Sequence, residues 1–376
     1  MEQIVSNTRN HHLIKYFQAN MMNNILLTGA AGYIGGTVLA DLLARQDGPV
    51  KAAKLFAAVR THEQVEILSK LAGVSVAQVD LLKKDVVEEF VQHNEIDFIV
   101  NLAPSFDLTI ASNLLNALGK RRQAGASDLR LIHSSVTAAF SKENGWPFGE
   151  ISDTGSVLAK TREIGDQHPV RMADILVADK GKELGVKTFN VTLPNVYGRG
   201  TGEGRKLSVS IPTYVRASIR NQIVNKFDKD GHPVAVHVTD LAALYVLLIE
   251  KILQREPIPS DDVGIYFGVA HTMSWWKVMS AIAQALYDRG LVKDMEPQVW
   301  SSYNAAADEL GWPRAYIRGM GASSPKLVPL NAYKLGWKPE WDESRFMDSI
   351  DDEVQSALDL DTGATSLYDS LQASKY

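Results

Sequence analysis

Cysteine is absent from the 376 residues of this sequence, which excludes disulfide bonds, cysteine-based zinc sites and thiol nucleophiles. Long hydrophobic runs are absent too, since no apolar stretch approaches the roughly 20 residues that a membrane-spanning helix needs. The first 20 residues have no continuous apolar core, which a secretory signal would require. From these absences we expect a cytoplasmic protein that does not have a membrane as its partner.

Dense tracts of basic charge are also lacking. The 39 Lys and Arg residues are balanced by 44 Asp and Glu residues, for a formal net charge of -5, so nucleic acid is not an expected partner. Hydrophobic residues make up 45% of the chain, a share typical of a globular protein with a sizeable core. The neighbours His11 and His12 do not converge on one face of a helix or strand, so no metal site is expected.

What the chain does contain, from Asn24 onwards, is an alternation of short apolar runs and longer helical stretches. Near-continuous apolar runs predict strands that are buried on both faces of a parallel sheet. The runs occupy residues 24–28, 54–60, 75–80, 96–103, 129–135 and 187–194. With crossover helices between them, they predict an α/β fold: a Rossmann doubly wound parallel sheet with a smaller C-terminal α/β substrate lobe.

The strand–helix rhythm ends at Tyr197, where a Gly- and charge-rich segment begins. We therefore divide the chain into three parts. Residues 1–23 form an N-terminal extension, residues 24–197 with a returning segment near 233–255 form a dinucleotide-binding domain, and residues 198–376 form mainly a substrate-binding lobe and C-terminal helices.

The segment "TGAAGYIGG", residues 28–36, places three glycines between a predicted strand and a predicted helix. Glycine suits this position because the turn is tight and a pyrophosphate must approach bare backbone. The start of the following helix then offers unpaired N–H groups to the phosphates. We expect a dinucleotide to contact Gly29, Gly32, Tyr33, Ile34 and Gly35.

The second and third predicted strands end in residues that bear on cofactor choice. Arg60 stands where an NAD site usually has an acidic residue, and a guanidinium suits a 2′-phosphate, so NADP(H) is favoured over NAD(H). The alternative is that Arg60 is a solvated strand-end residue. Asp80 and Leu81 follow the third strand, where they would contact the adenine, although an Asp in that place is equally typical of a helix N-cap.

These features resemble the extended short-chain dehydrogenase/reductase family, which includes the nucleotide-sugar epimerases and dehydratases, over roughly residues 24–353. "IVNLAPS" (99–105) is similar to the family's fourth strand, whose last residues contact the nicotinamide ribose. The resemblance implies that role for Leu102, Ala103 and Pro104, and places Ser105 beside the substrate. "VHVTDLA" (236–242) and "KLGWKPEW" (334–341) resemble later motifs of the extended branch.

The fifth and sixth strands carry the reaction site in that family. "IHSSVTAAF" (132–140) resembles the fifth strand, which implies that Ser135 is the catalytic serine and that Thr137 assists it. "VTLPNVYGRGTG" (191–202) resembles the sixth-strand motif. By that likeness Pro194 lies by the nicotinamide, and Asn195 and Tyr197 lie by the substrate. Ser208 and His237, outside this motif, are further candidate substrate residues. Family members often dimerise through a four-helix bundle, so a homodimer is an expectation here.

One part of the resemblance fails. Family members use a Tyr-x-x-x-Lys pair on the helix after the fifth strand, in which the Tyr exchanges a proton with the substrate and the Lys lowers the pKa of the Tyr. In this chain the Tyr register falls on Asp166 and the Lys register on Val170, and no Tyr occurs between Ser135 and Tyr197. The usual acid–base pair is missing.

His168 is the candidate replacement, because its ordinary pKa lies near neutrality. The alternative is a helix-start histidine beside a surface ion pair between Arg171 and Asp174, which are three residues apart. Three functions stay open. The first is an NADP(H)-binding enzyme that reduces a carbonyl or oxidises an alcohol of a small molecule with a non-standard proton donor. The others are a non-redox isomerase, lyase or cyclase, and an inactive NADP(H)-sensing protein.

Overall fold

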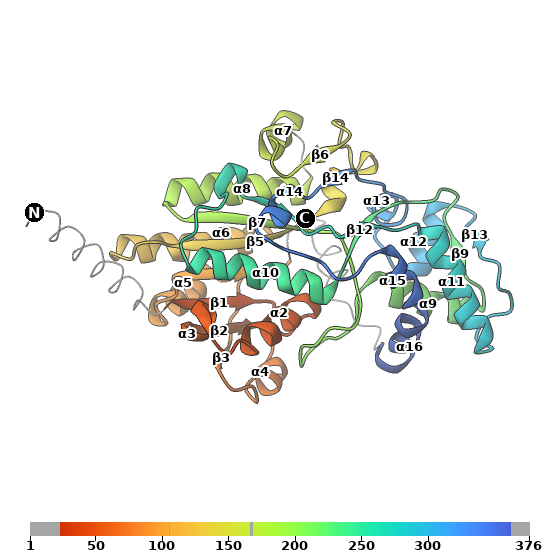
Figure 1. Ribbon diagram of the computed structural model, residues 1–376, viewed down its shortest axis with the longest axis horizontal. Coiled ribbons are helices and arrows are strands. Elements are labelled where there is room, and N and C mark those ends of the chain that lie inside the picture. Colours follow the sequence, from red (N-terminus) through yellow and green to blue (C-terminus); the bar gives the residue numbers. More distant parts are fainter. Residues whose placement is uncertain (1–22, 105, 166–167, 362–376) are drawn as a thin grey trace, which may run out of the picture.

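The computed structural model describes residues 23–104, 106–165 and 168–361 (Figure 1). Ser105 and Asp166, singled out above, lie outside the described residues, as do residues 1–22 of the predicted N-terminal extension. None of the helices in the described part combines the length and apolar character that crossing a bilayer requires.

Seven parallel strands form the central sheet, in the spatial order β11-β7-β5-β4-β1-β2-β3. Their bounds are β1 Asn24–Thr28, β2 Lys54–Val59, β3 Val74–Gln78, β4 Phe98–Asn101, β5 Arg130–Val136, β7 Lys187–Leu193 and β11 Ile265–Phe267. Strand β1 pairs with β2 on one side and with β4 on the other. This order confirms the predicted doubly wound Rossmann sheet, and its switch point, where such sheets bind ligands, lies between β1 and β4.

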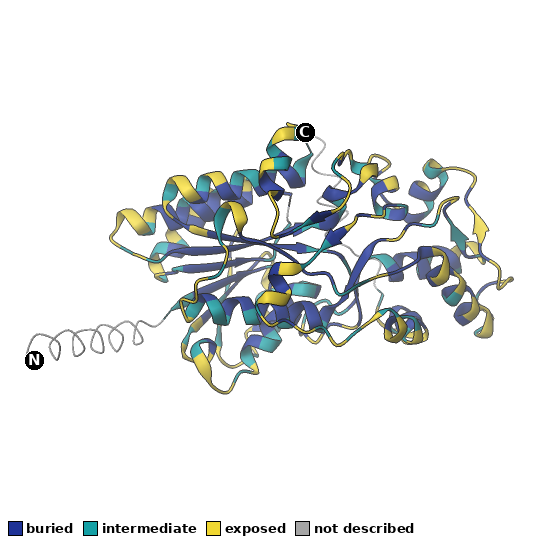
Figure 2. Ribbon diagram, turned by 45° about the horizontal axis from the view of Figure 1, so that its top comes forward, coloured by how far each residue is buried: buried dark blue, intermediate teal, exposed yellow. Residues whose placement is uncertain are grey.

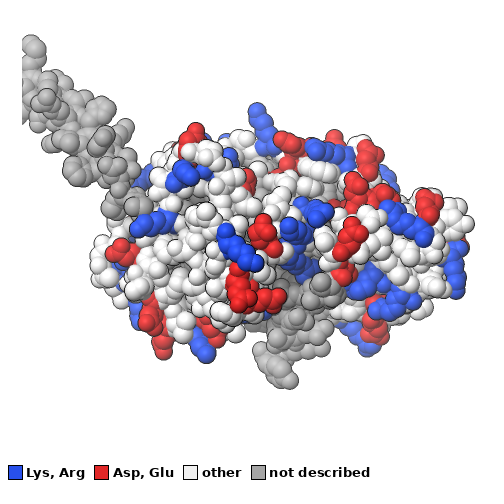
Figure 3. Space-filling view, turned by 90° about the horizontal axis from the view of Figure 1, so that it is seen from below, with Lys and Arg blue, Asp and Glu red and all other residues white. Residues whose placement is uncertain are grey.

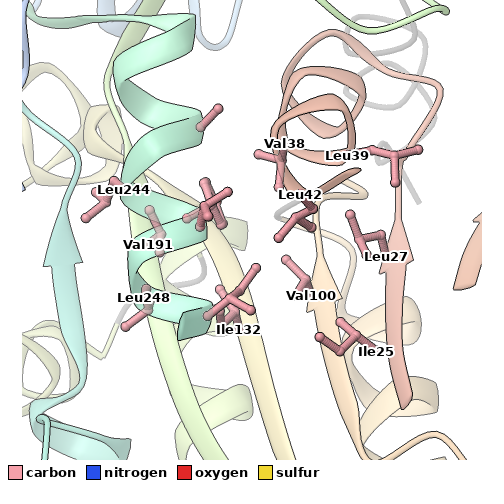
Figure 4. Close-up of a cluster of buried hydrophobic side chains, with 14 of the residues drawn as sticks. Ile25, Leu27, Val38, Leu39, Leu42, Val100, Ile132, Val191, Leu244 and Leu248 are labelled. Atoms are coloured by element: carbon pink, nitrogen blue, oxygen red, sulfur yellow. The ribbon is translucent and has the colours of Figure 1, made fainter. Parts of the chain in front are cut away.

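Helices cover both faces of the sheet because its strands are apolar on both sides. One face packs against α2 (Tyr33–Leu43) and α10 (Val238–Leu253), and Figure 4 shows Leu244 and Leu248 of α10 near Ile132 and Val191 of the sheet. The other face packs against α5, α6 and α8. The bounds of these and the neighbouring short elements are α3 Gly48–Ala52, α4 His62–Leu68, α5 Lys84–His93, α6 Leu108–Gln123, α7 Val157–Ile164, α8 Pro169–Leu184, η1 Thr137–Phe140, η2 Lys142–Asn144 and η3 Asp261–Val263.

The smaller lobe predicted from the sequence is present beyond the end of β7 and has an apolar core of its own, which includes Tyr214, Trp275 and Phe346. Its helices are α9 Ser210–Asn221, α11 Trp275–Asp288, α12 Tyr303–Leu310, α13 Ile317–Gly321, α15 Glu343–Asp348 and α16 Ile350–Leu360. The short helix α14 Leu330–Lys334 packs against β11 of the central sheet. Small sheets join β8 (Asn195–Tyr197), β10 (Val234–His237) and β12 (His271–Thr272), β9 (Asn225–Lys226) and β13 (Gln298–Val299), and β6 (Ile151–Ser152) and β14 (Leu327–Val328).

Burial and charge follow this layering. Figure 2 shows the central strands buried and the exposed residues gathered on the outer sides of the helices and on the loops. On the face drawn in Figure 3, basic and acidic side chains are interspersed over the described part of the surface. On this face the mixture of charges matches the balanced composition of the chain.

Candidate functional site

The residues predicted to bind a dinucleotide lie along one edge of the central sheet, where the parallel strands end. Their spatial order follows the strands: Asp80 comes after β3, Arg60 after β2, Gly29 after β1, Leu102 after β4, Thr137 after β5 and Pro194 after β7. Adjacent strands lie about 4.8 Å apart, so the edge from β2 to β5 spans about 14 Å. An elongated ligand laid across the switch point would pass these residues in that order.

The three glycines of the first turn have three different physical roles. Gly29 has a φ of +69°, and a methyl group on it would lie 2.5 Å from the carbonyl oxygen of Leu102. A methyl group on Gly35 would collide with the carbonyl of Gly29, so Gly35 sets the close approach of α2 to β1. Gly32 is the N-cap of α2, and a methyl group there would meet a single protein atom, the Gly29 oxygen at 3.0 Å. The space before the helix is thus open at Gly32, next to N–H groups that suit a phosphate.

A buried hydrogen-bond network holds together the ends of β1 and β4. The hydroxyl of Thr28 donates to the Asn101 side chain at 2.7 Å and accepts the N–H groups of Leu102 at 3.1 Å and Ala103 at 3.2 Å. Pro104 follows, half-buried. The backbone predicted to contact the nicotinamide ribose is therefore fixed relative to the glycine turn, and Asn101 is a positioning residue that the sequence analysis did not identify.

The Gly-rich segment after Tyr197 packs on the same turn. Tyr33 donates its hydroxyl to the Gly198 carbonyl at 2.6 Å, and Arg205 donates its backbone N–H to the Ala31 carbonyl at 3.1 Å. A methyl group on Gly204 would overlap the Ala31 oxygen. Glycine lets this backbone cross the start of α2 in direct contact, so residues 198–205 and the glycine turn form one rigid unit.

The two strand-end residues that bear on cofactor choice are exposed. The guanidinium of Arg60 makes no hydrogen bond or ion pair with any residue that the structure describes, so it is available to an anion. Asp80 accepts a hydrogen bond from the Leu82 N–H at 3.1 Å, while α5 is capped by Lys83. The alternative that Asp80 is the N-cap of that helix is therefore wrong. Leu81 is half-buried, and its carbonyl accepts a hydrogen bond from Asn113 at 2.9 Å.

Ser135, which the family resemblance places as the catalytic serine, is fully buried on the α8 side of β5. Its hydroxyl donates to the carboxylate of Asp174 at 2.8 Å, and Asn190 donates to the same group at 2.7 Å. The Nε2 atom of His133 lies 3.9 Å from Asp174. Burial raises the pKa of the Asp174 carboxyl to about 7, although both hydrogen bonds and the charge of Arg171 oppose the shift. The serine belongs to a buried polar cluster, and its catalytic role stays a prediction.

The expected surface ion pair between Arg171 and Asp174 is wrong, because both side chains are buried. Arg171 donates to the carbonyl oxygens of Ala139 and Asn144 and so holds the segment that follows β5. Polar residues on this helix were assigned to its outer surface, yet Asp174 lies four residues after the apolar Val170 and shares its face. That spacing was the available signal.

The start of α8 lies at the register where the family's Tyr-x-x-x-Lys pair would stand. Val170, at the Lys register, is buried in an apolar cluster with Phe106 and Phe140. His168 is the N-cap of the helix and precedes Pro169, as expected, and its side chain is half-buried. Thr137 begins the turn η1 at the end of β5 and is 6% exposed. The roles of His168 and Thr137 toward a substrate stay predictions.

Tyr197 and His237, predicted to contact the substrate, are both buried, and their contact with a substrate stays a prediction. The Tyr197 hydroxyl pairs with Nε2 of His271 at 2.8 Å. The His237 ring accepts the N–H of Thr239 and stacks on Trp341, with 3.9 Å between the ring centres. Burial, assisted by the charge of Arg345, lowers the pKa of His237 to about 4, so this ring is neutral at physiological pH.

The other predicted substrate residues are placed as follows. Ser208 is 2% exposed, Pro194 is buried, and Asn195 is half-buried and accepts a hydrogen bond from Ser210 at 3.2 Å. No group of three or more His, Asp or Glu side chains within the described residues is arranged to hold a metal ion. The structure thus brings Pro194 and Asn195 to the sheet edge and leaves Ser208 beneath the surface.

The two late sequence motifs, residues 236–242 and 334–341, are joined by hydrogen bonds. Asp240, at the start of α10, accepts the backbone N–H groups of Glu340 at 3.0 Å and Trp341 at 2.9 Å through one carboxylate oxygen. The indole of Trp337 donates to the Asp240 carbonyl at 2.8 Å. These bonds tie the C-terminal segment to the sheet, and the motifs are therefore structural in this chain.

Comparisons with known proteins agree with this architecture. The model of the NAD dependent epimerase/dehydratase family matches residues 25–258. Among solved structures, a UDP-glucose 4-epimerase of Thermus thermophilus in complex with NAD is 19% identical with a TM-score of 0.57, over 89% of this chain and 99% of its own. The Bordetella bronchiseptica enzyme WbmH with NAD+ is 15% identical with a TM-score of 0.60, over 91% and 100%. A dTDP-glucose 4,6-dehydratase of Bacillus anthracis with NAD is 16% identical with a TM-score of 0.58, over 89% and 96%. At these identities the likeness shows the fold, and a search of curated proteins found no match.

Proposed function

Because the chain belongs to the NAD dependent epimerase/dehydratase family, we propose that it binds a nicotinamide dinucleotide along the carboxyl edge of its central sheet and exchanges a hydride with a small-molecule carbonyl or alcohol. The observation that carries the proposal is the turn at Gly29, Gly32 and Gly35. Gly29 and Gly35 leave no room for a side chain, while Gly32 has a single protein atom near it in front of α2. The similar structures named above are complexes with NAD and have the same fold as this chain.

NADP(H) is the proposed form of the cofactor. Arg60 is exposed at the end of β2, next to the strand that carries the glycine turn, and its guanidinium is not engaged by any described residue. A planar guanidinium matches a 2′-phosphate and offers nothing specific to a bare 2′-hydroxyl. The similar structures contain NAD, so this preference would set the chain apart from them.

Hydride transfer also needs a proton for the substrate oxygen, and the described part of α8 leaves few donors. Val170 is apolar, Arg171 is committed to two carbonyls, and Asp174 lies beneath Ser135. His168 is half-buried at the start of the helix and carries an imidazole, the side chain most often used for proton transfer in enzymes. We therefore assign the proton transfer to His168, with the Thr137 hydroxyl as a hydrogen-bond donor to the carbonyl oxygen.

The apolar Val170 supports a second candidate, a protein that binds the dinucleotide without redox turnover. A Lys at that register would hold the nicotinamide ribose and assist proton exchange, and a buried valine does neither. This second function covers both the non-redox catalyst and the cofactor sensor. A measurement of turnover with bound cofactor separates it from the first.

Substitution of Gly32 with aspartate tests the cofactor site. Gly32 is an N-cap with extended backbone (φ −80°), and Asp is a favoured residue at that position. Its Cβ would lie 3.0 Å from the Gly29 oxygen, a close contact that a small shift of the turn relieves, and circular dichroism checks that the fold is kept. The new carboxylate would occupy the space of the phosphates, and we expect NADPH affinity to fall by roughly 100-fold. NADPH fluorescence titration measures the affinity, and Gln46→Asp, beyond the other end of α2, adds the same charge as a control. Equal affinity for NADPH in Gly32→Asp and wild type would refute the assignment.

A further inference from the structure

A cleft of about 760 Å³ opens where β11 ends. Val269 and Ala270, two and three residues after the end of β11, form one wall, and residues of β10, β12, β14 and α14 and of the segments next to them form the others. A volume of this size lies within the range of sites that hold small molecules. None of the residues that the sequence analysis named as substrate contacts lines this cleft.

The position of the cleft relates it to the proposed cofactor site. Strand β11 is the next strand after β7, and β7 is the next after β5, all parallel. The ends of these strands share one edge, so the cleft begins about 10 Å beyond the end of β5. A dinucleotide that runs from Arg60 past Gly29 and Leu102 would thus point its nicotinamide end toward the cleft.

The lining of the cleft is largely apolar. Val234, Val269 and Leu327 are buried and face it from three separate elements, while Leu330 of α14 is 42% exposed at its mouth. An exposed leucine next to buried apolar residues lowers the affinity of the cleft for water and raises it for an apolar ligand.

The charges at the cleft do not suit a diphosphate. Lys326 is the single Lys or Arg among the described residues of the lining, and Glu150 stands opposite it on the paired strand segments, since Leu327 pairs with Ile151. The Nε2 atom of His232 lies 3.3 Å from the carboxylate of Asp230. The side chain best matched to a phosphate group is Arg, through its bidentate fork, and the described lining of the cleft has no Arg.

We propose that this cleft binds the apolar body of the substrate, whose carbonyl end extends from the cleft toward Thr137 and His168, since those two residues do not line the cleft. The substrate is then a predominantly apolar aldehyde or ketone, or the matching alcohol, rather than a sugar nucleotide. The inference rests on the proposed function for its redox step. In that step the carbonyl carbon gains a hydride from reduced nicotinamide, the π electron pair moves to the oxygen, and the oxygen gains one proton. The products are the alcohol and the oxidised dinucleotide.

The test uses benzylacetone as an apolar ketone, with NMR titration of its binding to the full chain saturated with NADP+. Leu330→Asp places a charge at the cleft mouth on an exposed side chain, so the fold is kept. Leu358→Asp is the matched control, because Leu358 is 38% exposed on α16 and does not line the cleft. We expect Leu330→Asp to weaken benzylacetone binding about tenfold, Leu358→Asp to leave it unchanged, and UDP-glucose not to displace it.

Three outcomes would overturn the inference: no benzylacetone binding to the NADP+-loaded protein, equal weakening by both variants, or displacement by UDP-glucose. Cofactor binding is measured first and separately. A protein that binds no NADPH contradicts the proposed function, whereas a protein that binds NADPH and fails the Leu330 comparison contradicts the cleft alone.

Discussion

Replacement of Asp174 with asparagine should make the stability of the protein less dependent on pH. The carboxyl group lies buried between β5, β7 and α8 and accepts hydrogen bonds from Ser135 at 2.8 Å and Asn190 at 2.7 Å. Asparagine is nearly the same size, and its amide oxygen can accept from Asn190 while its amide nitrogen donates to the Ser135 oxygen. The substitution therefore removes the ionisable group and preserves the packing around it.

The magnitude follows from the pKa of Asp174, about 7 in the folded protein, against about 3.9 in an unfolded chain. Because the folded pKa is raised, the folded state holds the proton more tightly, and stability falls as pH rises from about 4 to about 7. Each pKa unit corresponds to about 1.4 kcal/mol. Between pH 5 and pH 8, ionisation of Asp174 should lower the free energy of unfolding by about 3 kcal/mol.

Urea unfolding of wild type and Asp174→Asn, followed by tryptophan fluorescence at pH 5 and pH 8, measures this difference. His133 and Arg171, the other ionisable groups near the carboxyl, are present in both proteins. Asp179→Asn, on the exposed side of the same helix, is the control and should behave as wild type. An identical change in unfolding free energy between the two pH values for wild type and Asp174→Asn would refute the reasoning.

Two further substitutions test the cofactor preference and the C-terminal attachment. Arg60→Ala should weaken NADPH binding about tenfold or more and leave NADH binding nearly unchanged, because only the 2′-phosphate pairs with the guanidinium. Fluorescence titration measures both affinities. Equal effects on the two cofactors would show that Arg60 is a solvated strand-end residue. Asp240→Ala should lower the free energy of unfolding by about 2 kcal/mol, because the backbone N–H groups of Glu340 and Trp341 lose their acceptor. Thermal unfolding measures the loss. Asp348→Ala, at an exposed residue of the same C-terminal segment, is the control and should unfold like wild type.

The sheet could be predicted because a strand that is buried on both faces appears in the sequence as a near-continuous apolar run. The run at residues 24–28 coincides with β1, and the run at 187–194 extends one residue beyond β7. The glycine turn was equally readable, because the spacing of its glycines between a strand and a helix is a local pattern, and Gly29 has a positive φ that glycine adopts readily. Both signals can be read locally in the sequence, although the contact that excludes a side chain at Gly29 is with Leu102 on the neighbouring strand.

The reaction site was harder to predict because successive side chains of a strand point to opposite faces. At the end of β5, Ser134 bonds Tyr245 of α10 at 2.7 Å, while Ser135 bonds Asp174 of α8. Hydroxyls therefore stand on both faces of one strand end, and a shift of one residue in register exchanges them. The composition of "HSSVT" gives no means to tell which hydroxyl reaches a ligand.

The buried charges were unpredictable for a related reason. Arg171 and Asp174 have hydrogen-bond partners that are 16 to 39 residues away in the chain, and charged residues are assigned to the surface unless such partners are known. His237 was read as a substrate contact from its motif, and the structure shows it stacked on Trp341, more than a hundred residues later. Long-range pairing of polar groups is the information that local patterns do not hold.

The central claim is that this chain transfers a hydride although it lacks the usual Tyr and Lys. Single-turnover absorbance at 340 nm, with NADPH bound to the purified protein and apolar aldehydes and ketones added in turn, tests it most directly. The account predicts loss of the reduced-nicotinamide band with at least one of these compounds. In His168→Gln the rate of that loss should fall by at least about 10²-fold. A flat trace for every compound, with NADPH shown to be bound, would contradict hydride transfer and favour a protein that holds the cofactor without redox turnover.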